Sequence, residues 1–400
     1  MSNTILTPTA VTREALRILH QKLNFVGSIE RQYDDSFAKS GAKIGADLKI
    51  RLPNEYTVRT GAALQAQDTA ESSTTLTVGT QKGVDLNFTS VDLTLSLDDF
   101  SKRILDPAMA VLAANIEADA LNMYKDVANS VWNSGSAMTI AHVLSGRKIL
   151  NDTLTPLDNR MALLNTQQMV DLVTDGKSLF NQQQEIGKQY KEGYAGRVAG
   201  FDFSENTLIP RHTRGSANGS YTTDTRTSAL ATDGTEYSSI TVASGSGTWA
   251  VGDGFTIANV NRVHPESKAD TGTARQFVIT AVSSGGAGTI SFAPSIILGG
   301  AKQNCTVASQ SATAAITVLG TASGADDTGL LYHKEAFAIA FADLQMPDGV
   351  DFARREVMDG ISMRIVRQYD INSDKFPCRL DVLYGYKTIR RQLACRVHNN

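Results

Sequence analysis

Residues 248–263 read TWAVGDGFTIANVNRV, and this stretch decides how the middle of the chain is interpreted. Gly252-Asp253-Gly254 is a turn signal, and the alternation of apolar and polar residues over 255–260 is typical of a β-strand. Further strand-like segments, separated by glycine-containing turns, lie at 239–243, 276–282, 289–293 and 315–319. Short strands at this spacing, with no helical period between them, predict a small all-β barrel or sandwich.

The composition changes over the same part of the chain. Residues 211–328 hold 15 of the 32 glycines, with only seven basic and eight acidic residues. A flexible Ser/Thr-rich linker is the alternative, but linkers lack large apolar side chains at strand spacing. Here such side chains are Trp249, Phe255, Phe277, Ile279, Ile290 and Phe292. We therefore expect an inserted all-β barrel domain over 213–327.

The segment before this region predicts a helix followed by strands. Residues 12–23 have the pattern of an amphipathic helix, with Leu16, Leu19 and Leu23 at spacings of three and four. Residues 54–83 are polar and rich in small residues, which predicts a long protruding β-loop. The flanking residues alternate as strands do, over 48–52, 84–88 and 91–97.

Asp106-Pro107 predicts the start of the longest helix, since Asp caps a helix well and Pro is tolerated at the first position. Apolar residues at intervals of three or four continue to Val131, so a helix ending at Trp132 would be about 39 Å long. Further helices are expected at 141–150 and 166–173, with strands at 161–164, 200–210, 336–341, 361–366 and 380–386. The barrel is thus predicted to interrupt an α+β body.

Charge and cysteine content exclude several classes of protein. The chain has 38 basic and 41 acidic residues and a net charge of −3, which excludes a protein that neutralises many DNA phosphates. Its longest apolar runs are too short to cross a bilayer, and residues 1–9 lack the basic start of a signal peptide. Cys305, Cys378 and Cys395 form no CxxC pair. We expect a protein made in a reducing cytoplasm.

Motifs of catalysis and cofactor binding are missing from the sequence. Residues 175–178, Asp-Gly-Lys-Ser, resemble the end of a phosphate loop, but Asp171 stands where that motif requires glycine. The six histidines are scattered, with none within four positions of another, so a metal ligand set is disfavoured. We expect no enzyme activity, no cofactor and no metal site.

The last fifty residues carry eight arginines and two lysines against six acidic residues. Nucleic-acid binding at single strands would need a stronger bias and interleaved aromatic residues. Arginine binds carboxylates bidentately, so a surface of salt bridges between subunits is the preferred interpretation. The candidates are Arg354, Arg355, Arg390 and Arg391.

The order of these elements resembles the major capsid (coat) proteins of tailed bacteriophages, which have the Hong Kong 97-like fold. Within that family it is similar to the short-tailed-phage branch, whose members carry an inserted β-barrel called the I-domain. Residues 197–202 resemble the strand before the insertion, 251–255 the turn and strand early in the barrel, and 330–334 with 360–364 the return into the body.

The resemblance implies a division of the chain into named parts. These are an N-arm and the start of the peripheral domain (1–45), an E-loop with returning strands (46–98), and a spine helix of the peripheral domain (99–135). They continue with a first part of the axial domain (136–212), the I-domain-like barrel (213–327) and the return of the axial and peripheral domains (328–400).

The resemblance also implies a function and partners. The chain would assemble with copies of itself, as hexamers and pentamers, and with a separate scaffolding protein into an icosahedral shell. A portal protein would occupy one vertex, and a decoration protein is a further candidate partner. The shell would form in the host bacterial cytoplasm, become the virion capsid, and enclose double-stranded DNA without reading its sequence or binding a membrane.

Lys82 is the only lysine of 54–83, at the base of the predicted loop, so covalent Lys–Asn crosslinks between subunits are not expected. We expect residues 221–236 to reach a neighbouring capsomer. The predicted assembly-interface residues are Leu16, Leu19, Leu23, Arg59, Asp224, Arg226, Asp233, Glu236, Arg354, Arg355, Arg390 and Arg391.

Three other functions fit parts of the pattern. A surface adhesin would bind carbohydrate through the β insert, and it would need exposed aromatic residues there. A cytoplasmic enzyme with a regulatory β insert is disfavoured because no catalytic motif is present. A bacterial nanocompartment shell protein has the same fold, but the barrel insertion argues against it.

Overall fold

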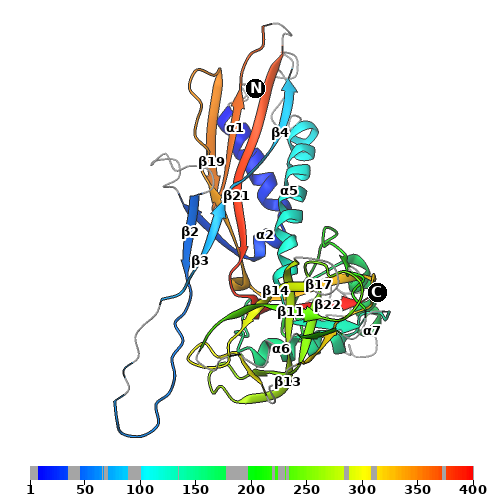
Figure 1. Ribbon diagram of the computed structural model, residues 1–400. Helices are drawn as coiled ribbons and strands as arrows, with labels where there is room; N and C mark the ends of the chain where they lie inside the picture. The colour runs from blue at the N-terminus through cyan, green and yellow to red at the C-terminus, as the bar shows by residue number, and fades with distance from the viewer. Residues whose placement is uncertain are drawn as a thin grey trace. The chain divides into compact units, whose positions relative to one another are not determined.

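The structure is a computed structural model that describes residues 8–34, 46–64, 66, 71–88, 101–133, 135–176, 197–218, 221–223, 230, 234–282, 288–307, 313–371 and 375–399. The chain divides into two compact units (Figure 1). Unit 1 combines Met1–Arg51, Ser73–Leu121 and Phe337–Ile389, and unit 2 combines Leu52–Ser72, Asn122–Ala336 and Arg390–Asn400. No helix in the described ranges is long and apolar enough to cross a membrane.

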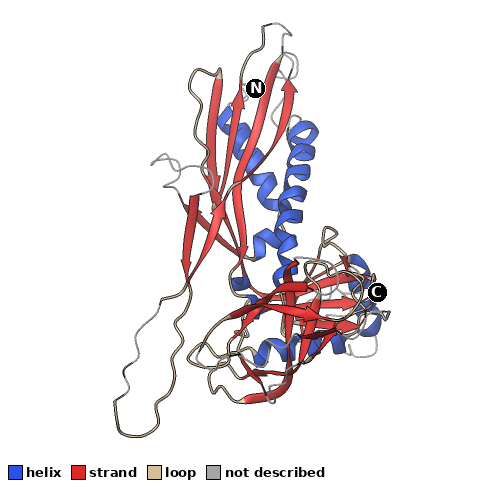
Figure 2. Cartoon of the chain, viewed as in Figure 1, coloured by secondary structure: helices blue, strands red, loops and turns tan. Residues whose placement is uncertain are grey.

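Unit 1 is a mixed sheet with helices packed against it (Figure 2). Its strand order is β1-β18-β21-β20-β19, and β4 pairs with β21. A separate two-stranded sheet joins β2 and β3. The bounds are β1 Glu30–Asp34, β2 Ala46–Arg51, β3 Ser73–Val78, β4 Thr80–Phe88, β18 Phe337–Ala342, β19 Phe352–Met358, β20 Ile361–Arg367 and β21 Phe376–Thr388, with helices α1 Pro8–Lys22, α2 Phe25–Ser28 and α5 Asp106–Leu121.

Helix α1 is the amphipathic helix that the sequence predicts, but its apolar face is covered by its own chain. Leu16, Leu19 and Leu23 are all buried. The helix packs on α5 and on the sheet strands β19 and β20. Unit 1 thus uses this face to close its own core, and the contact of the three leucines with a neighbouring subunit stays a prediction.

Helix α5 ends eleven residues before the predicted Trp132, at Leu121, and it is preceded by a π-helical turn, Ser101–Leu105. A 3₁₀ turn, Asn122–Asp126, follows it. Ser130–Asn133 then forms strand β5, which pairs in parallel with the C-terminal strand β22, Ala394–Asn399. The helical spacing of Val127 and Val131 was thus misleading, because a pairing with distant residues overrides local periodicity.

A buried carboxylate on α5 holds the start of α2. Glu117 is 2% exposed and accepts hydrogen bonds from the backbone N–H groups of Phe25, at 3.1 Å, and Val26, at 3.0 Å. The first N–H groups of a helix have no partner within it, so an acceptor on α5 satisfies them. This contact fixes the chain just after α1.

Strand β3 lies inside residues 54–83, the segment predicted as a long protruding β-loop, so the part without regular structure is shorter than the whole segment. Leu76 and Val78 of β3 are buried, and the strand packs against β21. Gly385 of β21 permits this approach, since a Cβ there would lie 2.2 Å from the carbonyl oxygen of Thr77. The strand predicted over 91–97 lies outside the described residues.

Unit 2 contains a second sheet, which we call the host sheet, with the order β5-β22-β17-β6-β8-β7. Strand β22 lies inside this sheet, between β5 and β17. Helices α6 and α7 pack with it around buried residues such as Phe201 and Leu331. The bounds are β6 Arg160–Leu164, β7 Arg197–Val198, β8 Phe201–Glu205, β17 Ala325–His333, α6 Ile140–Asp152 and α7 Thr166–Gly176; β9, His212–Thr213, pairs with β17.

The predicted β region is a closed six-stranded barrel, in which each strand pairs with the next in the order β12-β13-β14-β11-β10-β16 and β16 pairs back to β12. Phe255, Phe277 and Phe292 meet in its core, with ring centroids 5.1 to 5.7 Å apart. The strands are β10 Tyr221–Thr223, β11 Tyr237–Ala243, β12 Gly254–Val263, β13 Asp270–Val282, β14 Gly288–Ile296 and β16 Ala315–Val318. Strand β15, Cys305–Val307, pairs with residues 260–262 of β12.

Candidate functional site

The predicted interface arginines have carboxylate partners within their own chain. Arg354 lies 3.1 Å from Glu356, Arg355 lies 3.2 Å from Asp343, and Arg390 lies 2.7 Å from Glu335. These three side chains are thus paired within the chain, and their binding to carboxylates of a neighbouring subunit stays a prediction. Strand register explains a further pair, since Arg364 and Asp381 stand opposite each other in β20 and β21 and approach to 2.6 Å.

The remaining predicted residues are not brought together. Arg59 is exposed and donates to the carbonyl oxygen of Gly61 in its own loop. Glu236 forms an exposed ion pair with Lys302, at 3.8 Å. Arg391 is half-buried in a 3₁₀ turn, Arg391–Leu393. Asp224, Arg226 and Asp233 lie outside the described residues.

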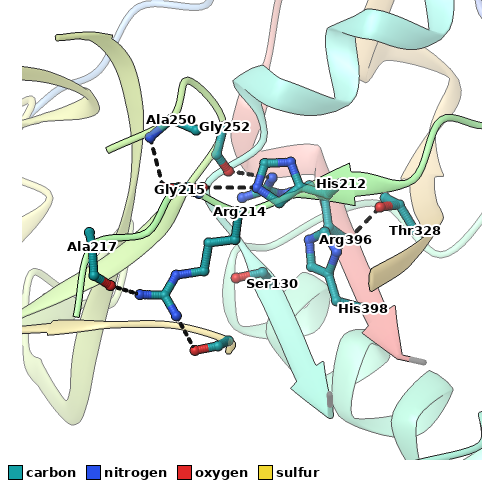
Figure 3. A network of polar contacts seen from close by, with 12 residues as sticks. Ser130, His212, Arg214, Gly215, Ala217, Ala250, Gly252, Thr328, Arg396 and His398 are labelled. Carbon is teal, nitrogen blue, oxygen red and sulfur yellow. Dashed lines mark hydrogen bonds and ion pairs between the residues drawn. The ribbon is translucent and has the colours of Figure 1, made fainter. Parts of the chain in front are cut away.

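The structure instead gathers a buried polar network that the sequence analysis missed (Figure 3). It lies in unit 2, where the turn before β12 of the barrel meets the host sheet. His212 comes from β9, Asp253 from the turn, and Arg396 and His398 from β22. None of these four residues is more than 1% exposed.

Asp253 is the acceptor at the centre of this network. Its carboxylate accepts from the ring Nε2 of His212, at 3.1 Å, and from the backbone N–H groups of Ala250, at 2.9 Å, and Gly215, at 3.2 Å. The second ring nitrogen of His212 lies 3.2 Å from the hydroxyl of Tyr124. A buried carboxylate needs such donors, because burial without them costs several kcal/mol.

Arg396 supplies the positive charge of the network. Its Nη1 donates to the carbonyl oxygen of Gly252, at 2.8 Å, while Nε and Nη2 have no partner in the described part of the chain. Burial lowers the pKa of this guanidinium to about 10, so it remains charged at neutral pH.

His398 stacks on Trp132 with ring centroids 3.9 Å apart, and its Nδ1 lies 3.3 Å from the hydroxyl of Thr328. Burial, together with the nearby Arg396 and His212, lowers the pKa of His398 well below its usual value. The ring is therefore neutral at neutral pH, which suits a stacked position in a core that already holds a buried arginine.

Further contacts join the barrel to its surroundings in unit 2. The Gln276 side chain of β13 accepts from the N–H of Ser130, at 2.7 Å, and donates to the carbonyl oxygen of Ser130, at 2.9 Å. The Arg214 guanidinium donates to the carbonyl oxygens of Gly320 and Ala217, and so bridges the two segments that connect the barrel to the host sheet.

The chemistry of this network is structural. Its ionisable groups are buried and are bonded mostly to each other and to backbone, so they hold segments together. In the described residues no group of three or more His, Cys, Asp or Glu side chains could hold a metal ion. One sequence signal could have revealed the network: the charged Arg396 and the polar His398 alternate with the apolar Cys395 and Val397 in a fully buried strand.

Comparison with known proteins assigns the family. The family described as "P22 coat protein - gene protein 5" matches residues 28–395, nearly the whole chain. The chain belongs to the P22 coat protein family. It is therefore a bacteriophage major capsid protein, a component of the virion, and the predicted α+β class with a Hong Kong 97-like fold is confirmed.

Solved phage structures resemble this coat protein at low sequence identity. A structure of Mycobacterium phage Che8 is 11% identical, with a TM-score of 0.47 over 94% of this chain and 90% of that one. The mature capsid of bacteriophage PhiM1 is 12% identical, with a TM-score of 0.45 over 94% and 87%. The satellite phage P4 procapsid, which includes the size determination protein, is 10% identical, with a TM-score of 0.41 over 97% and 91%. No curated protein sequence matches the chain.

Proposed function

We propose that this coat protein assembles, with a separate scaffolding protein, into an icosahedral shell of hexamers and pentamers that packages double-stranded DNA. A portal protein would occupy one vertex of the shell, and a decoration protein remains a candidate partner. The family match supports the shell, and the charge of −3 supports the packaging role. A nearly neutral wall allows DNA to pack and leave, whereas a strongly basic wall would bind it.

One observation carries the proposal of contact between copies: the segment that follows β2 exposes large apolar side chains. Tyr56 is 57% exposed, Val58 94% and Leu64 87%, within nine residues that form neither helix nor strand. A cluster of this kind favours an interaction site over a free surface. In a symmetric assembly the partner surface is another copy of the same chain.

The contacts between copies are proposed to be non-covalent. Lys82 lies 2.6 Å from Asp119 of α5, so its ammonium group is held in an ion pair. All three cysteines are free and buried, and burial raises the pKa of Cys305 to about 11 and of Cys378 and Cys395 to about 12. Buried thiols held protonated are inert at neutral pH.

The adhesin alternative loses its support in the barrel. Carbohydrate binding would need exposed aromatic rings, but the aromatic residues available there fill the barrel core instead. The buried ones are Tyr221, Trp249, Phe255, Phe277 and Phe292.

The experiment is co-expression with the scaffolding protein of the same phage, followed by sedimentation through a sucrose gradient. We expect wild-type chains to sediment as shells, and Val58→Asp to leave folded chains at the top of the gradient, because a charge would enter an apolar contact. Val58→Thr, which keeps the side-chain shape without a charge, should assemble. If Val58→Asp yields shells in the wild-type amount, the exposed segment does not carry assembly.

A further inference from the structure

We propose that the turn Ala250–Gly254 and strand β22 form a latch that holds the barrel in one orientation on the host sheet. The latch consists of Gly252 and Asp253 on the barrel and of His212 and Arg396 on the host side. It acts within one chain, so it does not depend on shell assembly. The turn is the same one that marks the middle of the sequence as β structure.

The turn is part of the rigid barrel. The backbone N–H of Gly252 donates to the carbonyl oxygen of Ile279 in β13, at 2.9 Å. The N–H of Ile279 donates in return to the carbonyl oxygen of Asp253, at 3.0 Å. A side chain that binds this turn is therefore fixed relative to the whole barrel.

Side chains from two strands of the host side, β9 and β22, bind this turn. The His212 ring binds the Asp253 carboxylate. The Arg396 guanidinium binds the Gly252 carbonyl oxygen, as Figure 3 shows. Gly252 has a φ of +99°, and a Cβ there would lie 2.9 Å from the His212 ring and 3.2 Å from the Lys125 side chain. A glycine at this position permits the left-handed backbone and the close approach of the host residues.

The covalent links alone would leave the barrel free to pivot. Only two segments connect it to the host sheet, and they are bonded to each other: the N–H of Arg214 donates to Gly324 and that of Ser323 donates to Gly215. Such a two-stranded ribbon fixes the distance between the barrel and the host sheet. It still allows the barrel to rotate about the ribbon. Hydrogen bonds at the separate turn, Ala250–Gly254, prevent this rotation.

One buried apolar cluster between the barrel and the rest of unit 2 is small and gives the barrel little direction. The cluster joins Ala128, which precedes β5, with Val278 and Ala293 of the barrel. Two of these three side chains are single methyl groups, and apolar contact has no preferred angle. Hydrogen bonds are directional, so the two that Asp253 and Gly252 accept from the host side determine the orientation.

The test measures the distance between two nitroxide labels by pulsed electron paramagnetic resonance. The labels are placed at Ser239→Cys in β11 of the barrel and at Lys148→Cys in α6, both exposed positions, in the full-length monomer. The three native cysteines are buried and will not react with the label. We expect a single narrow distance distribution in the otherwise unchanged chain.

Arg396→Met removes the hydrogen bond to the Gly252 carbonyl oxygen, and we expect the distance distribution to broaden at least two-fold. Hydrogen exchange should meanwhile remain unchanged in the strands β11 and β14, which shows that the barrel stays folded. Arg160→Met is the matched control. Arg160 is equally buried in unit 2, but it donates to Pro156, Thr155 and the side chain of Asn151, away from the barrel. This control should keep the narrow distribution.

A second variant tests the same idea from the barrel side. Asp253→Ala removes the carboxylate that binds the His212 ring and should also broaden the distribution, so the test stands even if Arg396→Met fails to fold. A narrow distribution in the folded Arg396→Met chain would overturn the proposal. Fast hydrogen exchange throughout the barrel of either variant would also overturn it, because the barrel would then depend on the host sheet for its fold.

Discussion

Leu19→Asp should unfold unit 1. Leu19 is fully buried in α1, where the helix packs on α5 and on the sheet. Shortening a buried leucine to alanine alone costs about 2–5 kcal/mol, and a carboxylate placed in the same cavity costs more. We expect a loss of at least about 4 kcal/mol, a large part of the stability of an ordinary domain. Hydrogen exchange of peptides from α1 and α5 measures this loss directly.

Gln21→Asp is the control on the exposed face of the same helix. It introduces the same charge two residues away, and it should change the unfolding free energy of unit 1 by less than about 1 kcal/mol. The account would be contradicted if Leu19→Asp kept wild-type protection in α1 and α5 and lost only shell formation. In that case the leucine face would serve a neighbouring subunit, as the sequence pattern first indicated.

The stability of unit 2 should fall as the pH drops from 7.5 to 5.5. His398 is buried and stacked on Trp132, and its surroundings are Arg396 on its own strand, His212 on β9, Thr328 on β17, and Asp253 and Tyr124 beyond His212. Its pKa in the folded protein is well below 6.5. Burial also lowers the pKa of His142 and of His333.

The direction of this pH dependence follows from proton uptake by the unfolded chain. Above pH 7 neither the folded nor the unfolded chain protonates His398, so this group leaves stability unchanged. Below 6.5 the unfolded chain takes up a proton that the folded chain does not, and the free energy of unfolding falls by up to about 1.4 kcal/mol per pH unit.

Urea unfolding followed by tryptophan fluorescence measures this effect, since both tryptophans, Trp132 and Trp249, lie in unit 2. His398→Phe should keep the stack on Trp132 and reduce the dependence on pH. Thr328→Val removes the hydrogen bond between Thr328 and His398 but keeps the imidazole. It should therefore lower the free energy of unfolding at every pH and keep the wild-type slope of that free energy against pH. An unchanged slope in His398→Phe would show that another group causes the acid sensitivity.

Local pattern predicted the barrel strands well. Glycine turns and period-two alternation identified the cores of β11, β12, β13, β14 and β16, because a half-buried strand imposes this pattern on its own residues. Helices α6 and α7 were identified for a similar reason. The start of α5 at Asp106 was predicted correctly, but its C-terminal end was not, since Val131 keeps the helical spacing while its actual partner is Val397 of β22.

The sequence could not show which partner covers each surface. An amphipathic pattern in α1 reveals an apolar face, but it does not distinguish a core within the chain from a contact between chains. The count of arginines likewise did not reveal that strand register places Arg364 opposite Asp381. The polar network escaped notice because its members are far apart in the chain: His212 and Asp253 by 41 positions, and Gly252 and Arg396 by 144.

Electron microscopy of particles from cells that express this chain with its scaffolding protein shows whether the chain forms an icosahedral shell. The proposed function predicts closed shells of uniform diameter, built from hexamers and pentamers of this one chain. Chains that remain monomeric, or that form only irregular aggregates while both proteins are soluble and folded, would contradict it.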